Sequence, residues 1–440
     1  MKGTQRPENI STKLQRVAEL AREAPELVFT ALAHHIDIEF LKEAFKRTRK
    51  NGAVGVDGQD AAQYAENLDG NLEILLNQFK SGTYKAPPVR RVHIPKGDGK
   101  KTRPIGIPSF EDKVLQRAVV MVLEAIYEQD FLDCSYGYRP RRSAHQALEA
   151  LWKGIMGMGG GWVIEVDIKD FFGNLDHTYL RSFLDQRVRD GVIRRTIDKW
   201  LAAGVLEEGH LSYPESGSPQ GGVVSPIVSN VYLHEVMDKW FEHTVKPLLS
   251  GKAFMIRLAD DIVCVFERER DARRFYEVLP KRFAKYGLEL HATKTKLIDF
   301  RRPPSKGSGK FESFDVLGFT HKWGLSRRGY SVVQRVTSPG RLKQAVKDVY
   351  QWCKENRHMP LKEQHQMLVL KLRGHYGYYG ITGNSERLQT FRNWTGLAWF
   401  KWLSRRSQKV TLSWERFEAI IRRYPLPPAR IVHSNLAASP

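Results

Sequence analysis

Two adjacent aspartates between two short apolar runs constrain the fold of this chain more than any other feature of its sequence. The runs Phe254–Leu258 and Ile262–Phe266 have the length of strands, and Ala259, Asp260 and Asp261 join them. The pattern predicts a β-hairpin with both carboxylates at its tip. Adjacent carboxylates beside buried strands repel each other and lose hydration unless a cation neutralises them. An ordinary polar turn would show the same residues, because aspartate is common in turns.

A third aspartate lies near the end of another short apolar run. The run Val163–Ile168 predicts a strand that contains Asp167, and a partner strand would bring this residue beside Asp260. Magnesium prefers carboxylate oxygens, and such a triad can hold two ions about 3.5–4 Å apart. Taken alone, Asp167 would also suit the cap of a strand. The order of strand, helix and Asp-Asp hairpin is more specific than either part.

The charge of the chain indicates a polyanionic partner. Its 440 residues carry 70 Lys plus Arg against 49 Asp plus Glu, a net charge of +21. Contacts to phosphates release counterions, which favours binding of nucleic acid to such a surface. Residues 336–440 alone contain 18 basic and 6 acidic side chains, a net +12, interleaved with Trp and Tyr. We therefore expect a separate binding domain there, although ribosomal and membrane-surface proteins share the basic bias.

The cysteines and the hydropathy of the chain exclude several classes of protein. Cys134, Cys264 and Cys353 lie far apart and form no Cys-X-X-Cys pair, which argues against a zinc site or a disulfide scaffold and fits a reducing cytosol. The N-terminus has no apolar signal core, and the chain has no run of about 18 apolar residues to span a bilayer. We expect a cytoplasmic protein with no membrane partner.

Periodicity and turn residues predict the other elements. We expect helices within residues 11–50, 60–80, 110–153, 177–203, 225–243 and 270–286, a basic hairpin formed by 89–95 and 102–108, a strand near 297–300, and a largely helical chain beyond Val336.

Nine motifs together carry a family resemblance. In chain order they are Asn51–Gly58, Arg90–Lys96, Thr102–Pro108, Tyr136–Pro140, Val166–Phe172, Gly217–Pro226, Leu258–Asp261, Lys294–Lys296 and Phe314–Phe319. In this order they resemble the group II intron-encoded reverse transcriptases, over roughly residues 25–435. The resemblance implies a right-hand polymerase of the α/β (α+β) class, with fingers and palm around an antiparallel palm sheet, followed by an α-helical thumb. It implies an N-terminal helical extension (1–83), fingers and palm (84–335) and a thumb/maturase-specific RNA-binding domain (336–440).

The resemblance also implies roles for single residues. Asp167, Asp260 and Asp261 are then the catalytic residues and the ligands of Mg²⁺. The implied nucleotide-site residues are Arg90, Lys96 and Arg103 for the triphosphate, Phe172 against a ribose 2′-hydroxyl, Gln220 at the template–nucleotide pair, and Lys294, or equally Lys296, as the proton donor to pyrophosphate. Without the resemblance, the cations would pass for surface residues and Phe172 for a core residue.

Three departures from the family pattern stand out. Leu258 occupies a position where the family usually has Tyr, which removes a ring beside the catalytic turn but leaves both carboxylates. Asp170 and Gly173 stand where the family more often shows Gly and then Asp. The sequence ends soon after His433, so we expect neither a DNA-binding segment nor an endonuclease beyond it.

The expected function is that of an RNA-directed DNA polymerase. Its partners would be an RNA template, a DNA primer, deoxynucleoside triphosphates and a structured group II intron RNA, whose splicing and retrohoming it would assist. Two alternatives stay open. One is a non-catalytic RNA-binding maturase, mildly favoured by Leu258. The other is an intron-free enzyme of the same class that acts in DNA repair or phage defence.

Overall fold

The computed structural model describes residues 10–95, 102–207, 209–213, 217, 221–303, 312–326, 328–407 and 412–434. The chain divides into two compact units. The first comprises Met1–Ala150 and Trp162–Leu297, and the second comprises Leu151–Gly161 and Ile298–Pro440. The sequence-based limits at 83/84 and 335/336 stay predictions.

A buried helix, α5 (Phe110–Asp130), organises the helical part of the first unit. Most of its residues are buried and apolar, and α1 (Ile10–Glu23) and α2 (Ile38–Arg47) pack against it. The stretch 11–50 is not helical throughout, since the chain leaves α1 after Glu23 and begins α2 only where Asp37 accepts a hydrogen bond from Phe40 N at 2.9 Å. Helices α3 (Ala61–Ala65) and α4 (Leu68–Ser81) confirm the helical prediction for 60–80.

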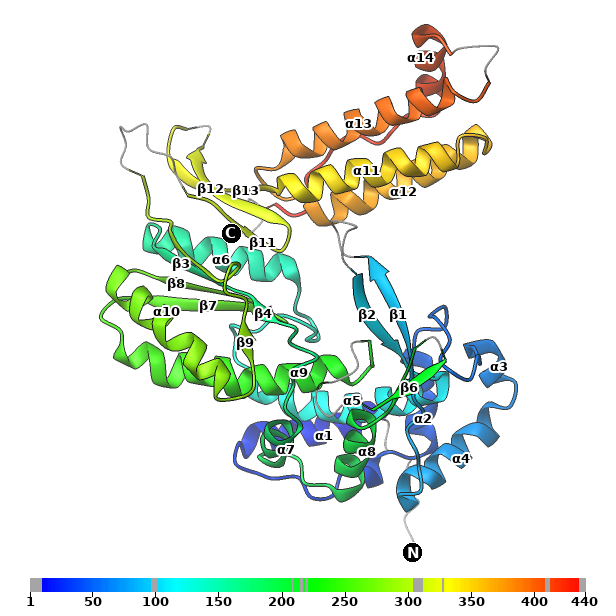
Figure 1. Ribbon diagram of the computed structural model, residues 1–440, viewed down its shortest axis with the longest axis vertical. Coiled ribbons are helices and arrows are strands. Elements are labelled where there is room, and N and C mark those ends of the chain that lie inside the picture. The colour runs from blue at the N-terminus through cyan, green and yellow to red at the C-terminus, as the bar shows by residue number, and fades with distance from the viewer. Residues whose placement is uncertain are drawn as a thin grey trace, which may run out of the picture. The chain divides into compact units, whose positions relative to one another are not determined.

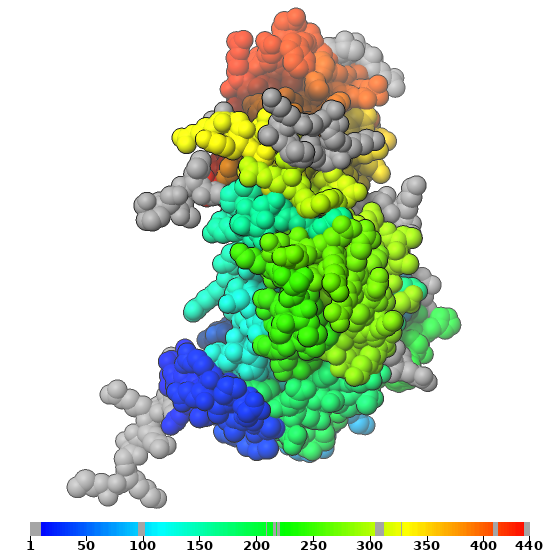
Figure 2. Space-filling view, turned by 90° about the vertical axis from the view of Figure 1, so that its left-hand side faces the viewer, coloured from blue at the N-terminus to red at the C-terminus, as the bar shows by residue number. Residues whose placement is uncertain are grey.

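The central sheet has the strand order β10-β3-β8-β7 (Figure 1). Strand β3 (Trp162–Val166) pairs antiparallel with β8 (Asp261–Phe266), which pairs antiparallel with β7 (Ala253–Leu258). The edge strand is β10 (Lys296–Asp299). Helix α10 (Glu269–Ala284) packs against β3 and β8 and so buries their apolar side chains. The green and yellow-green surface in Figure 2 includes this helix. The predicted antiparallel hairpin and its partner strand are confirmed.

A second sheet carries the basic hairpin. Strands β1 (Val89–Pro95) and β2 (Thr102–Ile107) pair antiparallel, as the sequence predicts. Strand β1 also pairs in parallel with β5 (Val205–Glu207), and β6 (His210–Ser212) completes the order β2-β1-β5-β6. The last two strands are too short to show an alternating pattern, and sequence periodicity does not predict them.

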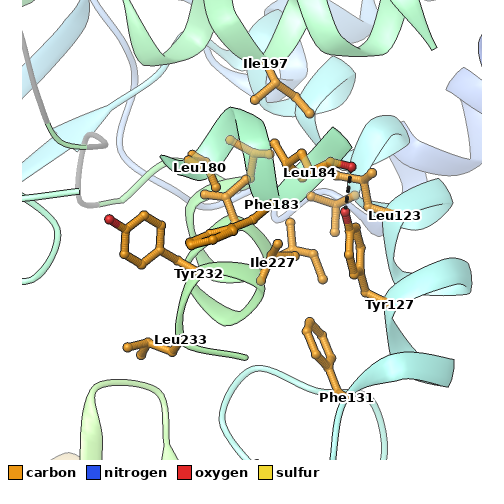
Figure 3. Close-up of a cluster of buried hydrophobic side chains, with 14 of the residues drawn as sticks. Leu123, Tyr127, Phe131, Leu180, Phe183, Leu184, Ile197, Ile227, Tyr232 and Leu233 are labelled. Atoms are coloured by element: carbon orange, nitrogen blue, oxygen red, sulfur yellow. Dashed lines mark hydrogen bonds between the residues drawn. The ribbon is translucent and has the colours of Figure 1, made fainter. Parts of the chain in front are cut away.

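Three helices fix the chain on both sides of the glycine-rich loop before residue 225. They are α7 (His177–Asp185), α8 (Gly191–Leu201) and α9 (Ser225–Leu233). Their apolar faces meet those of α5 in the cluster of Figure 3, where Phe183 and Ile227 lie near Tyr127. The hydroxyl of Tyr127 donates to Leu184 O at 3.4 Å. A long loop between buried helices therefore has fixed ends.

The second unit combines a small sheet with a helical bundle. Strands β11 (Phe314–Val316), β12 (Phe319–Leu325) and β13 (Ser331–Thr337) are antiparallel and were not predicted individually. The indole of Trp152, on α6 (Ala144–Met158), donates to Val333 O at 2.8 Å. The helices that follow are α11 (Pro339–Glu355), α12 (Leu361–Tyr379), α13 (Ser385–Leu403) and α14 (Trp414–Arg423). They share a core of their own around Trp399, and their presence confirms the helical prediction beyond Val336. In the part of the chain that the structure describes, no helix is both long and apolar enough to cross a membrane.

Candidate active site

The Asp-Asp hairpin turns within two residues. Leu258 and Asp261 are the last paired residues of β7 and β8, so Ala259 and Asp260 form the turn. Ala259 has a φ of +57°, a left-handed conformation that costs about 1–2 kcal/mol for a residue with a Cβ. Asp260 is half-buried and Asp261 is exposed. The turn thus presents both carboxylates at the end of the sheet, on a backbone held in an unfavourable conformation.

Asp167 reaches the same end of the sheet from the neighbouring strand. It follows β3 directly, and Val166, the last residue of β3, pairs with Ile262. Continuing this register by one residue brings Asp167 alongside Asp261. The three aspartates singled out by the sequence therefore lie at the same end of one sheet, although 93 positions separate Asp167 from Asp260.

The segment after β9 (Glu289–Leu290) contacts Asp167. His291 N donates to Asp167 O at 2.8 Å, and Thr295 Oγ1 lies 3.3 Å from Asp167 N. Lys294 Nζ lies 3.2 Å from Asp167 Oδ2, with side chains 59% and 37% exposed, so this ion pair contributes little to stability by itself. Its location is informative, because it puts an ammonium group beside one of the three carboxylates. Lys296, the other candidate proton donor, is exposed at the start of the edge strand β10.

The three aspartates at this end of the sheet have the chemistry that magnesium requires, but their side chains do not converge on a single point. Three aspartates offer hard oxygen donors, which suit Mg²⁺. Among the described residues, however, no three acidic, His or Cys side chains converge closely enough to form a metal site as they stand. The amine of Lys294 neutralises part of the charge on Asp167 instead. The three carboxylates fit Mg²⁺ as ligands once their side chains rotate toward a common point.

Arg257 anchors the turn from below, a role that sequence reasoning missed. Its side chain is fully buried and makes two hydrogen bonds to Asp238, at 2.8 and 2.6 Å. It also donates to Asn230 Oδ1 (2.9 Å), Ser135 Oγ (2.7 Å) and the carbonyl of Ala259 (3.2 Å). Burial disfavours the ionised form of Asp238, but the charge of Arg257 holds the pKa of Asp238 below its usual value. The signal for this role in the sequence is a single Arg inside an apolar strand, because a buried guanidinium group needs a buried anion as its partner.

The Tyr136–Pro140 motif packs against the same turn. The chain before it runs parallel to β7, and Tyr136 N donates to Arg257 O at 2.8 Å. A Cβ at Gly137 would overlap the backbone of Ala259, so only glycine fits there. The next residue, Tyr138, has a φ of +55° and is 60% exposed. Partial burial, and then the charges of Asp260 and Asp261, raise the pKa of Tyr138.

The turn that carries Phe172 lies against Gly217. Phe172 is half-buried, and its ring lies edge-on to Phe171 with centroids 5.3 Å apart. Asp170 has a φ of +41°, and a Cβ at Gly173 would overlap its carboxylate. A Cβ at Gly217 would lie 2.7 Å from Phe172 O. The backbone of Gly217 therefore lies close against the turn, an approach that requires glycine.

The structure describes two of the three cations predicted for the triphosphate. Arg90 donates through Nε and one terminal nitrogen to Val54 O, at 3.0 and 2.7 Å, and so ties β1 to the Asn51–Gly58 loop. Arg103 is exposed on β2 opposite Ile94. Lys96 and Gln220 lie outside the described residues.

Comparison with known proteins gives one family and several relatives. Residues 94–321 match the family described as reverse transcriptase (RNA-dependent DNA polymerase). The group II intron-encoded protein LtrA of Lactococcus lactis subsp. cremoris is 38% identical over 231 residues, which is 52% of this chain and 38% of the relative. Protein YkfC of Escherichia coli (strain K12) is 36% identical over 251 residues, 56% of this chain and 65% of the relative. Nuclear intron maturase 2, mitochondrial, of Arabidopsis thaliana is 31% identical over 175 residues, 31% of this chain and 24% of the relative. The matches thus cover less than two thirds of the length of each of these relatives.

Proposed function

The chain belongs to the reverse transcriptase (RNA-dependent DNA polymerase) family, and we propose that it is an active RNA-directed DNA polymerase of the group II intron type. The family has the fold of a right-hand polymerase, and the mixed helical and antiparallel architecture agrees with it. We assign the central sheet to the palm, the hairpin β1–β2 to the fingers and the bundle α11–α14 to the thumb. In this assignment residues 1–83, 84–335 and 336–440 are the three domains.

The observation that carries the proposal is that the three aspartates lie together at one end of the central sheet. Asp167 and Asp260 would hold two magnesium ions and Asp261 would complete the acidic cluster. Such ions activate an attacking 3′-hydroxyl and stabilise the leaving oxygen. The surrounding protein keeps the turn in place through Arg257, which bonds both Asp238 and the carbonyl of Ala259. The ion pair of Lys294 with Asp167 holds an ammonium group at this end of the sheet. From there Lys294 would donate a proton to the departing pyrophosphate.

The remaining residues would form the nucleotide site. Arg103 and Lys96 would bind the triphosphate, because cations offset its charge. Arg90 already bonds Val54 O, so its share in that site would use the remaining terminal nitrogen. Phe172 would exclude the 2′-hydroxyl of a ribonucleotide, and Gln220 would contact the template–nucleotide pair.

We further propose that the protein binds a structured group II intron RNA and assists its splicing and retrohoming. The names of its relatives, an intron-encoded protein and an intron maturase, support this partner, as does the net +12 of residues 336–440. The second candidate is a maturase without polymerase activity. Leu258, which leaves the catalytic turn without the usual ring, is the observation that favours it.

One experiment separates the two candidates. Primer extension on an RNA template and filter binding of the same RNA are measured for the wild type, Asp167→Ala, Asp260→Ala and the control Asp69→Ala, whose side chain on α4 is 75% exposed. Both active-site variants should lose extension by at least about 10³-fold, since metal ligands are removed. RNA binding should stay within about twofold of the wild type, because it depends on the basic surface.

Extension by the Asp260→Ala variant at the rate of the control would refute the catalytic assignment. A wild type that binds RNA tightly but extends no primer would favour the maturase without polymerase activity.

A further inference from the structure

We propose that Tyr138 is a substrate-contacting residue of this site, whose ring lies against the nucleotide at the 3′ end of the primer. The inference deepens the proposed function and rests on it. It gives this chain an aromatic contact beside the catalytic turn, which Leu258 does not supply.

The first support is the position of the backbone. Gly137 lies so close to Ala259 that a Cβ would overlap the turn, and Gly137 O accepts a hydrogen bond from Asn230 Nδ2 at 2.7 Å. Asn230 Oδ1 in turn accepts from Arg257 at 2.9 Å. One buried network therefore holds the catalytic turn and the residue immediately before Tyr138. The position of Tyr138 is thus tied to that of Asp260.

The second support is the conformation of Tyr138 itself. Its φ of +55° is unfavourable for a residue with a Cβ, and such strain persists only where the surroundings enforce it. Arg139 supplies part of this constraint, since it donates to Leu132 O and Ser135 O at 2.8 and 2.9 Å. Asn or Gly would adopt this backbone more easily than Tyr. An aromatic residue at this position suggests a use for the ring.

The third support is exposure. Tyr138 is 60% exposed although its neighbour Tyr136 is buried. If the ring served only to pack against the protein, it would be buried. An ordinary surface residue, in turn, would not require a strained backbone beside the three aspartates. In the proposed reaction the primer 3′-hydroxyl must reach Asp260 and Asp261. A ring beside that turn is within reach of the terminal nucleotide, and aromatic rings contact nucleotides through stacking and apolar packing.

The test uses the full chain with Tyr138→Ala, Tyr138→Phe and Tyr138→Asn. Tyr138→Asn removes the ring but suits the left-handed backbone, which guards against a loss that arises from misfolding. Tyr330→Ala serves as the matched control, because Tyr330 is also exposed, at 68%. Thermal melting should be the same for all four variants within a few degrees.

Two readouts are measured. Single-nucleotide extension should fall about 10–100-fold in kcat for Tyr138→Ala and Tyr138→Asn, because the attacking group is less well positioned. The KM for the deoxynucleoside triphosphate should change less than about threefold in the same variants, and Tyr138→Phe should behave like the wild type. The affinity for a primer–template with a dideoxy end, which cannot react, should fall about 10-fold without the ring.

The dideoxy binding assay separates the two proposals. A wild type that extends no primer refutes the proposed function, whereas ring-dependent binding of the dideoxy primer would still support the contact. Unchanged extension and unchanged dideoxy binding in both ring-free variants would overturn the assignment of Tyr138. A Tyr138→Phe variant as impaired as Tyr138→Ala would also overturn it, because the ring would then not be the group that acts.

Discussion

At Gly173 the carboxylate of Asp170 fills the space that a side chain would need. A Cβ there would overlap Oδ2 of Asp170, and Asp170 itself adopts a φ of +41°. The sequence places Asp at 170 and Gly at 173, and the structure shows that the two positions are in contact. Any side chain at position 173 would therefore have to displace the carboxylate of Asp170. Positions 170 and 173 therefore compete for the same space, and we expect their side chains to depend on each other.

This dependence predicts a non-additive pair of substitutions. Gly173→Asp alone should lower the free energy of unfolding by about 1 kcal/mol, because two carboxylates then compete for one space. Adding Asp170→Gly should restore most of that loss, since glycine tolerates the left-handed backbone. A double-mutant cycle by chemical unfolding measures the coupling, expected near 1 kcal/mol. Gly374→Ala, where a Cβ meets nothing within 4 Å, is the control and should not be destabilising. Additive effects of the two changes would show that the positions are independent.

Other residues of the site differ in how well the sequence predicted them. The three aspartates are predictable because each lies at the end of an apolar run and the runs follow one another in the order of the resembled family, although each aspartate taken alone would also suit a turn or a strand cap. Tyr138 was noticed only as part of a motif, since its strain and exposure depend on the backbone around it. Arg257 looked like an interruption of a strand. Its role became clear only from the buried partner Asp238, on a segment 19 residues away.

Among elements, local patterns predicted hairpins better than helix limits. Both hairpins have an alternating or apolar run on each side of a polar connection, and this information lies within one short stretch of chain, residues 253–266 and residues 89–107. The helical prediction for 177–203 is confirmed, but the sequence pattern does not show that this range contains two helices, α7 and α8. Asp190 ends the continuity because it caps α8 by accepting from Val192 N and Ile193 N, at 2.9 Å each. It also accepts from Leu32 N and Ala33 N, a tertiary contact that no local pattern can reveal.

The elements around the loop before α9 meet at a buried acid, Asp112 on α5. It accepts hydrogen bonds from the hydroxyl of Tyr84, from Trp200 Nε1 at 2.6 Å and from Gln116 Nε2 at 2.9 Å. Gln116 also accepts from Val224 N, at the start of α9, at 3.1 Å. Despite these donors, burial raises the pKa of Asp112 to about 6.

Asp112 should therefore make stability depend on pH. Its pKa in the folded state lies above the unfolded value of about 3.9, so the folded state binds the proton more tightly. The resulting stabilisation is complete below about pH 4 and is lost as the pH rises through about 6, by up to about 3 kcal/mol.

Asp112→Asn should remove this pH-dependent component of stability. We expect the difference in unfolding free energy between wild type and variant to shift in favour of the variant between pH 4 and pH 7. Chemical unfolding across this range measures it, with Asp69→Asn as the exposed control. Parallel pH profiles for wild type and Asp112→Asn would contradict the prediction.

At the scale of the whole molecule, the charge is distributed unevenly along the chain. Residues 336–440 carry +12 of the net +21, and the helices α11–α14 have a core of their own. The sequence was sufficient to locate this basic segment. It could not say which of its aromatics are free to contact RNA. The structure buries Trp399 completely and leaves Trp394 52% exposed, so only some of the aromatic side chains are accessible for contact with RNA.

If the bundle is the RNA-binding surface, the location of charge matters more than its total. A variant of the bundle replaces four exposed cations of α11 and α12 with Gln, namely Lys343, Lys347, Lys362 and Arg373. This variant should bind structured RNA more weakly than the wild type. Each phosphate that the protein no longer neutralises lowers the slope of log affinity against log salt by roughly 0.7–0.9, so the slope should fall by up to about 3.

The matched control changes the net charge equally by replacing four exposed cations of the first unit, namely Arg22, Lys46, Lys80 and Lys281. Filter binding of one RNA at several salt concentrations measures both variants. If both variants show the same decrease in slope, the interaction follows net charge alone and the bundle is not a specific RNA site. If the slope falls only in the bundle variant, its cations bind phosphate directly, as a thumb and RNA-binding domain requires.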